Sequence, residues 1–145
     1  MFNMFGGGNF YAPFNTTFFS QFNVSTSALP GVFGPWFEVT TGITFPGRWI
    51  DVRLGSGPLM AGNIVALQLG LGAIGAEVPW QPAVAPPGII PAFTFVWTRD
   101  ALGAFLPSPG FVFPITLPQN RRVTCRALGG LAGVDTFLTN VVIWG

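Results

Sequence analysis

The 145-residue chain contains no histidine and no lysine. Without histidine, no Ser-His-Asp or Cys-His nucleophile can be assembled and no His-ligated metal site is possible. The absence of lysine excludes Schiff-base chemistry, Ser-Lys dyads and a phosphate-loop lysine. The remaining acid–base candidates are five scattered acids that lie in no catalytic signature: Glu38, Asp51, Glu77, Asp100 and Asp135. We therefore expect no enzymatic activity, no catalytic residue, no metal site and no cofactor.

Cysteine is nearly absent as well, since Cys125 is the single one. One cysteine excludes an intrachain disulfide and a Cys-based zinc site, so the fold must rest on packing and backbone hydrogen bonds. In the segment VTCRAL, Cys125 alternates with Thr124 and Arg126, a pattern that favours a small buried thiol over a nucleophile. The length suits one domain that buries roughly 70% of the surface exposed by its unfolded chain.

Charge is scarce. Only 8% of the residues are charged and the net charge is +1, whereas soluble domains usually have about 25% charged residues. The chain also has 16 phenylalanines and five tryptophans. Such a surface would be poorly soluble by itself, so we expect other chains or lipid to cover much of it.

The stretch 54–76 has no charge and is long enough to span a bilayer. It nevertheless contains Pro58, Asn63, Gln68 and six glycines, and its apolar residues recur with a period of two rather than 3.6. The pattern therefore favours a strand, and we expect no membrane partner.

The glycine-rich string GLGAIG ends that strand, with Gly70, Gly72 and Gly75 in the G-x-G-x-x-G spacing of dinucleotide-binding folds. A true fingerprint opens a helix and has an acidic residue about twenty positions later. Here a proline-rich segment follows at once, and the first acid after Glu77 is Asp100. The string predicts a tight corner between strands, where glycine permits positive φ or a close backbone approach.

Alternating apolar residues predict further strands, and no segment has a convincing helical period. The predicted strands lie at about 36–45, 48–54, 63–71, 92–98, 111–118, 121–128 and 136–145. Turn signals recur about every ten to fifteen residues. The sequence thus predicts an all-β fold, a single antiparallel β-sandwich of the jelly-roll kind, over residues 31–145.

Residues 1–30 are uncharged, biased toward Asn, Phe, Gly, Ser and Thr, and show no sustained alternation. Aromatic rings along an extended backbone suit an arm that packs into grooves on a neighbouring subunit. The alternative is an N-terminal strand within the chain's own domain. The residues expected at this interface are Phe10, Tyr11, Phe14, Phe18, Phe19 and Phe22.

Arg121, Arg122 and Arg126 form the basic cluster of the sequence. Nucleic-acid binding needs a positive field that a net charge of +1 does not supply, so we expect no nucleic-acid partner. Salt bridges to acids of another subunit are the favoured use of these arginines. The five tryptophans leave a carbohydrate-binding sandwich open as an alternative, although tryptophan is also enriched at protein interfaces.

Three segments together resemble a known group: LGLGAIGAE at 69–77, LPQNRRVTCRA at 117–127 and VVIWG at 141–145. In the glycine and arginine positions of these segments, the chain resembles the small β-sandwich virion proteins of tailed bacteriophages. The resemblance implies a non-enzymatic capsid decoration or cement protein, or otherwise a tail, baseplate or fibre component. We accordingly expect a symmetric homo-oligomer, a trimer, located in the virion and bound to the major capsid protein or to other virion proteins.

Overall fold

The computed structural model describes residues 16–55, 60–81, 93–106 and 110–145, and within them it contains strands and turns but no helix. The strands are β1 (Thr17–Ser25), β2 (Phe37–Thr40), β3 (Gly47–Leu54), β4 (Ile64–Leu71), β5 (Val78–Pro79), β6 (Thr94–Arg99), β7 (Phe105–Leu106), β8 (Phe111–Leu117), β9 (Val123–Gly129) and β10 (Thr136–Trp144). None of these residues belongs to a helix that could cross a membrane.

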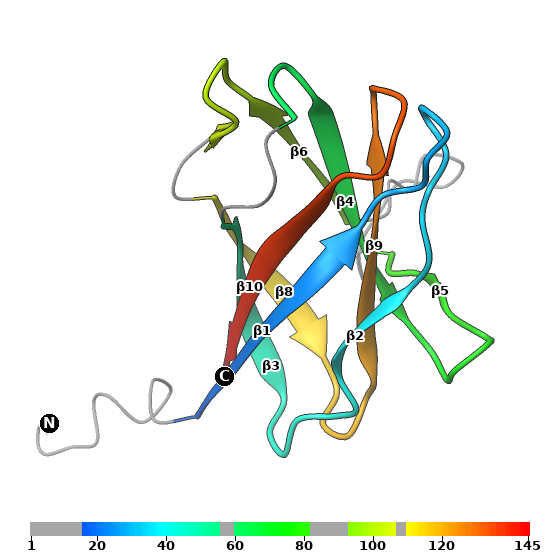
Figure 1. The fold of residues 1–145 in the computed structure, drawn as a ribbon. Helices are drawn as coiled ribbons and strands as arrows, with labels where there is room; N and C mark the ends of the chain where they lie inside the picture. The colour runs from blue at the N-terminus through cyan, green and yellow to red at the C-terminus, as the bar shows by residue number, and fades with distance from the viewer. Residues whose placement is uncertain (1–15, 56–59, 82–92, 107–109) are drawn as a thin grey trace, which may run out of the picture.

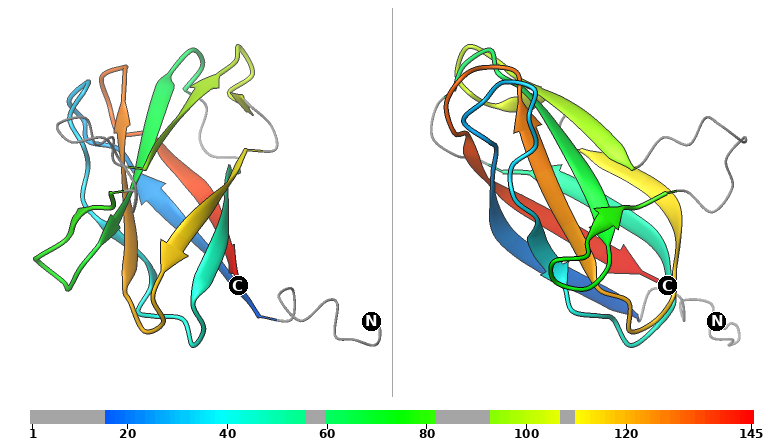
Figure 2. Two further views of the ribbon diagram at one scale, coloured as in Figure 1. Left: turned by 180° about the vertical axis from the view of Figure 1, so that it is seen from behind. Right: turned by 90° about the vertical axis from the view of Figure 1, so that its right-hand side faces the viewer.

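The strand pairing is that of a jelly roll. When the two-residue strands β5 and β7 are set aside, the first strand pairs with the last, the second with the last but one, and so on inward. These antiparallel pairs are β1 with β10, β2 with β9, β3 with β8, and β4 with β6. The long hairpin is rolled into two facing sheets, of order β1-β10-β3-β8 and β2-β9-β4-β6-β7 (Figures 1 and 2). The predicted all-β antiparallel sandwich is confirmed.

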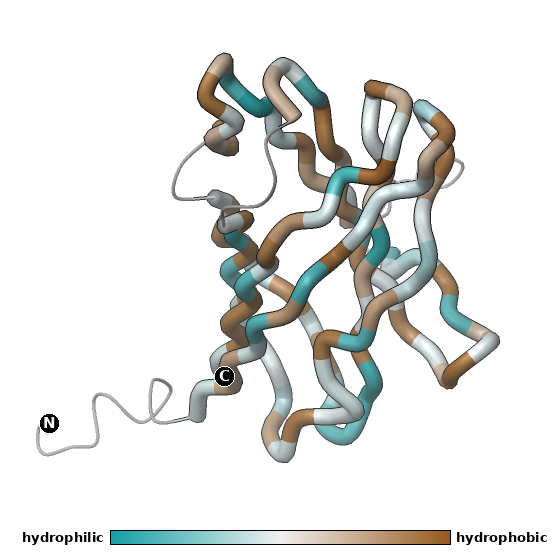
Figure 3. Tube along the Cα trace, in the orientation of Figure 1, coloured by the Kyte–Doolittle hydropathy of each residue, from teal (hydrophilic) through white to brown (hydrophobic). Residues whose placement is uncertain are grey.

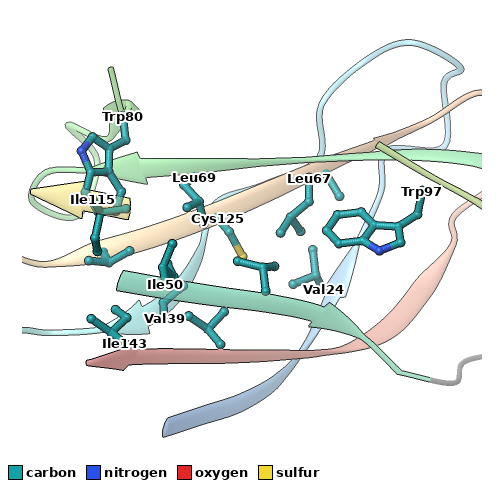
Figure 4. Close-up of a cluster of buried hydrophobic side chains, with 14 of the residues drawn as sticks. Val24, Val39, Ile50, Leu67, Leu69, Trp80, Trp97, Ile115, Cys125 and Ile143 are labelled. Carbon is teal, nitrogen blue, oxygen red and sulfur yellow. The ribbon is translucent and has the colours of Figure 1, made fainter. Parts of the chain in front are cut away.

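The core lies between the two sheets and follows the alternation of the strands. In β10, every second residue is buried, and in β4 the inward residues Val65, Leu67 and Leu69 have no exposed surface. Figure 4 shows Leu67 and Leu69 of one sheet in a cluster with Val24 and Ile50 of the other. Each fully buried aliphatic side chain of this kind stabilises the fold by about 1.5–3 kcal/mol.

Cys125 lies in this core with no exposed surface, as the sequence predicts. Burial raises the pKa of its thiol well above the usual range, so the reactive thiolate is not formed at neutral pH. We expect a thiol reagent to label the native protein at least a hundred times more slowly than the urea-unfolded chain. Absorbance of the released thiol-reagent chromophore measures both rates, and fast labelling without urea would contradict the buried position.

The glycine corner after β4 is also confirmed. Gly72 and Gly75 have positive φ values of +126° and +81°, which side-chain-bearing residues rarely adopt. Gly70 has another role, since a Cβ atom there would lie 2.5 Å from the ring of Trp36. The corner then returns as β5, which pairs with the end of β4.

The N-terminal arm predicted for residues 1–30 is wrong for residues 17–25. They form β1, which pairs with β10 along its whole length. Val24 has no exposed surface, and Phe18 and Phe22 pack against the core from the inner side. The alternative, a strand within the chain's own domain, therefore holds here, and the sandwich includes residues 17–25, which the predicted boundary at residue 31 excluded. Phe10, Tyr11 and Phe14 lie outside the described residues.

The strand predicted at 36–45 is shorter than expected, because β2 ends at Thr40. The hydroxyl of Thr40 accepts a hydrogen bond from the Gly42 N–H (3.1 Å) and turns the chain there. Ile43 still reaches the core, since it is only 2% exposed. The backbone therefore leaves the sheet while the apolar side chain beyond the turn remains buried.

A buried ion pair ties together the loops at the upper end of the sandwich, which include residues 26–32, 60–63, 100–104 and 130–135 (top of Figure 1). Arg99 donates from Nε and Nη2 to the two carboxylate oxygens of Asp135, at 3.0 and 2.6 Å. Their side chains are 1% and 0% exposed. Asn63 donates to the same carboxylate (2.9 Å), and the Thr26 hydroxyl accepts from the Asp135 N–H (2.9 Å). Four separate segments are thereby joined by one polar cluster.

Candidate interaction surface

The acidic residues of the chain are all engaged within it. Asp51 pairs with Arg53, Asp135 with Arg99, and Glu38 and Glu77 with Arg122. Asp100 accepts hydrogen bonds from the backbone N–H groups of Leu102 and Ala104 in its own turn. The surface therefore offers no cluster of free carboxylates, and among the described residues no group of three or more metal-ligating side chains occurs.

Arg122 locks the glycine corner onto the rest of the sheet. Its Nε donates to Glu38 (2.9 Å), and its Nη1 donates to both Glu77 and the Gly72 carbonyl (2.9 Å each). Hydrogen bonding to Glu38, and secondarily to Glu77, raises the pKa of Arg122 against the opposing effect of burial. The acids that Arg122 contacts thus belong to its own chain, whereas the sequence led us to expect acids of another subunit.

The contact between Arg122 and Glu77 should depend on pH. Hydrogen bonding to Arg122 holds the pKa of Glu77 below its ordinary value of 4.5. Because the folded pKa is the lower one, the contact stabilises the fold above the unfolded pKa and is lost as pH falls through the folded pKa. The Gly75 N–H donates to the Glu77 carboxylate (3.0 Å), so its NMR signal should titrate with a midpoint below 4.5. The variant Arg122→Gln should raise that midpoint. An unchanged midpoint would show that Arg122 does not lower the pKa of Glu77.

Arg126, on β9, lies flat on the outer side of the sheet β2-β9-β4-β6-β7. Its guanidinium carbon lies 4.3 Å from the ring centroids of both Phe33 and Trp36. Its Nε and Nη2 donate to the side-chain oxygen of Gln68, at 2.9 and 2.7 Å. Burial lowers the pKa of Arg126. The rings of Phe33 and Trp36 thus pack against the guanidinium. Trp36 also lies against Gly70 of β4, so the outward-facing side of that strand is largely covered as well.

The outer side of the sheet β1-β10-β3-β8 carries a contiguous apolar surface. Register places Phe19 beside Val142, and Trp144 beside Trp49. It also places Val112 and Pro114 opposite Asp51 and Trp49. We call this set the outer apolar face: Phe19, Trp49, Val112, Pro114, Val142 and Trp144. Phe19, Trp49 and Val112 are 59%, 44% and 55% exposed.

The charged side chains on this face neutralise each other. Arg53 donates to Asp51 from Nη2 at 2.7 Å and from Nε to both carboxylate oxygens. Asp51 is consequently almost buried although it lies on the outer side of the sheet. The outer apolar face thus presents aromatic and branched side chains around one compensated ion pair, a composition typical of protein interfaces.

A second group of exposed apolar residues occupies the loop tips at the upper end, which are brown in Figure 3. It consists of Leu29, Val32, Leu102, Leu131 and Val134. The loop after β1 and the loop after β9, which carry all of these residues except Leu102, are hydrogen-bonded to each other, from Gly133 N–H to the Ala28 carbonyl (2.9 Å) and from Gly31 N–H to the Gly129 carbonyl (2.8 Å). The buried Arg99–Asp135 pair supports them from below.

The predicted interface residues do not form one site. Phe18 and Phe22 point into the core, whereas Phe19 points outward onto the outer apolar face. Arg122 and Arg126 lie on the opposite sheet in contacts within the chain, and Arg121 is exposed in the turn before β9. The residues of this face that sequence reasoning missed are Val112, Pro114 and Val142, whereas Trp49 and Trp144 are among the five tryptophans considered for sugar binding. Each missed residue is an apolar residue at an outward position of a predicted strand, and that pattern could have identified it.

Comparisons with protein-family models, with curated proteins and with solved structures found no match for this chain.

Proposed function

We propose that this chain is a non-enzymatic structural protein of a virus particle, which decorates the head of a tailed bacteriophage and stabilises it through contacts between subunits. The observation that carries the proposal is the outer apolar face, where aromatic and branched side chains stand exposed on a chain of very low charge. Jelly rolls are common in viral capsid domains, but the fold by itself does not assign a function. A place in the tail, baseplate or fibre would use the same surface.

Burial of the outer apolar face against neighbouring proteins would provide the binding free energy that holds a decoration protein on a particle. Removal of apolar surface from water contributes about 25 cal/mol per Å². About 1,000 Å² buried per subunit would contribute on the order of 25 kcal/mol, before association entropy and side-chain ordering reduce it. The homo-oligomer and the contact with a larger shell expected from the sequence both belong to this proposal.

One observation favours a second candidate, a carbohydrate-binding module. Trp49 and Trp144 lie directly opposite each other on adjacent strands, and the hydrogen-bonded pair Gln21–Asn140 lies on the same face. Flat rings beside amide groups can stack and hydrogen-bond a sugar. Against it, the apolar surface extends beyond the two tryptophans to Phe19 and Val112, which a sugar does not require.

Sedimentation of lysate from the producing host through a density gradient distinguishes the two candidate functions. We expect the protein to sediment with particles and the variant Val112→Arg to remain in the soluble fractions. Its matched control is Val96→Arg, since Val96 is 50% exposed on the outer side of the opposite sheet and should not affect sedimentation. A purely soluble protein that is retained on a polysaccharide column would overturn the proposal in favour of sugar binding.

A further inference from the structure

Strand β1 is a long sheet edge without the features that normally protect one. It has nine residues, TFFSQFNVS, with no charged side chain, no proline and no bulge against β10. It ends the order β1-β10-β3-β8 and pairs, within the described chain, with no strand on its other side. An edge of this kind presents unpaired backbone groups and is a template for another strand.

The other sheet edges are short or interrupted. The remaining edge of the same sheet, β8, has Pro114 in its middle, and its register against β3 shifts. In the second sheet, β2 has four residues and an irregular register, and β7 has two. Short length, proline and irregularity are the usual means of preventing edge pairing. The contrast singles out β1.

Hydrogen bonds at the two ends of β1 identify which backbone groups face outward. Gly145 N–H donates to the Thr16 carbonyl (3.1 Å), and Thr26 N–H donates to the Asp135 carbonyl (2.9 Å). Antiparallel partners alternate between hydrogen-bonded and non-hydrogen-bonded pairs, so the even-numbered residues of β1 bond to β10. The N–H and C=O groups of Phe19, Gln21 and Asn23 consequently point to the outer edge.

Gln21 is the middle residue of β1. Gly34 approaches the Ser25 carbonyl so closely that a Cβ atom on Gly34 would lie 2.5 Å from its oxygen. Pairing is therefore obstructed at Ser25. A second strand centred on Gln21 can pair with the outward groups of Phe19, Gln21 and Asn23 and end before Ser25.

We infer that β1 pairs antiparallel with β1 of a second copy of this chain, about a two-fold axis at Gln21. This register opposes Gln21 to Gln21 and Phe19 to Asn23 on the outer side of the sheet, and Ser20 to Phe22 on the inner side. The segment carries no charge, so no like charges meet, and the half-buried Phe22 gains cover from the second copy. One such edge per chain gives a closed, isologous dimer.

The proposed contact between two copies of β1 rests on the features of that strand alone, so it holds whether or not the protein belongs to a virus particle. A two-fold contact cannot by itself close a ring of three. The trimer expected from the sequence would therefore need a second contact elsewhere on the molecule, such as the outer apolar face.

Cross-linking of the full chain tests the register. Because Cys125 is buried and inert, a cysteine introduced by Gln21→Cys is the accessible thiol. Residues in a hydrogen-bonded antiparallel pair have Cα atoms about 5.5 Å apart, a distance that a disulfide spans. We expect mild oxidation to give mostly disulfide-linked dimer, and urea to abolish its formation. The control Thr98→Cys, at an exposed position on β6, should give at most a tenth as much. Equal yields for the two variants would overturn the inference.

Backbone substitution tests the hydrogen bonds. Gln21→Pro removes an outward N–H without affecting a bond to β10, whereas Gln21→Ala removes only the side chain. By analytical ultracentrifugation, we expect the proline variant to weaken dimerisation at least tenfold and the alanine variant by less than threefold. Near-UV circular dichroism checks that both are folded. A chain that stays monomeric at all concentrations, or that pairs at β1 with a different protein or with its own residues instead, would overturn the inference.

Discussion

A chain without residues 1–30 is expected not to fold cooperatively. The deletion removes β1, the strand that pairs along nine residues with β10. It also removes Val24, which is fully buried, and the rings of Phe18 and Phe22 that pack on the core. Each such side chain contributes up to about 1.5–3 kcal/mol. Their loss, with that of the strand's backbone hydrogen bonds, is comparable with the whole stability of a domain, about 5–15 kcal/mol.

Urea titration followed by tryptophan fluorescence checks this expectation. The deleted chain should show no cooperative transition, whereas a chain that begins at Thr16 retains all of β1 and should unfold cooperatively. A cooperative transition in the chain without residues 1–30 would mean that β1 is an appendage, as the sequence suggested, and would contradict its place in the sandwich.

The second large effect is expected from Asp135→Asn. The substitution keeps the shape of the side chain but leaves the Arg99 guanidinium, 1% exposed, without a counter-charge. It also turns an amide donor toward Arg99 or toward the Asn63 amide, which now donates to the carboxylate. Removal of one partner from a buried ion pair costs about 3–5 kcal/mol.

The matched control is Asp51→Asn, which breaks the pair with Arg53, whose side chain is 49% exposed. Because water can solvate the Arg53 guanidinium that is left without its partner, this variant should shift the urea midpoint much less than Asp135→Asn does. Similar small shifts for the two variants would show that the Arg99–Asp135 cluster does not hold the upper end together.

The alternation of apolar residues was sufficient to predict most strands and their inner faces. Val65, Leu67 and Leu69, for example, are buried where a period of two places them. In β1 the signal was masked, because Phe19 breaks the alternation on the outer side and Ser20 breaks it on the inner side. A segment of uncharged polar residues and phenylalanine therefore resembled an arm although it pairs as a strand.

Long-range polar contacts could not be predicted. Arg99 and Asp135 are 36 residues apart, and Arg122 lies 84 and 45 residues from Glu38 and Glu77. No local pattern indicates these partners, because only the rolling of the hairpin brings their strands together. The outer apolar face depends on the same topology, since it combines residues of β1, β10, β3 and β8 that are adjacent in the sheet but distant in the chain.

The central claim, that neighbouring proteins in a particle cover the outer apolar face, is tested most directly by hydroxyl-radical footprinting with mass spectrometry. Free protein and particle-bound protein are labelled side by side, with the buried Trp97 as an internal check that the fold is intact. We predict that labelling of Trp49 and Phe19 falls several-fold in particles, while Trp97 stays unlabelled in both. Equal labelling of Trp49 and Phe19 in the free and the particle-bound protein would contradict the claim.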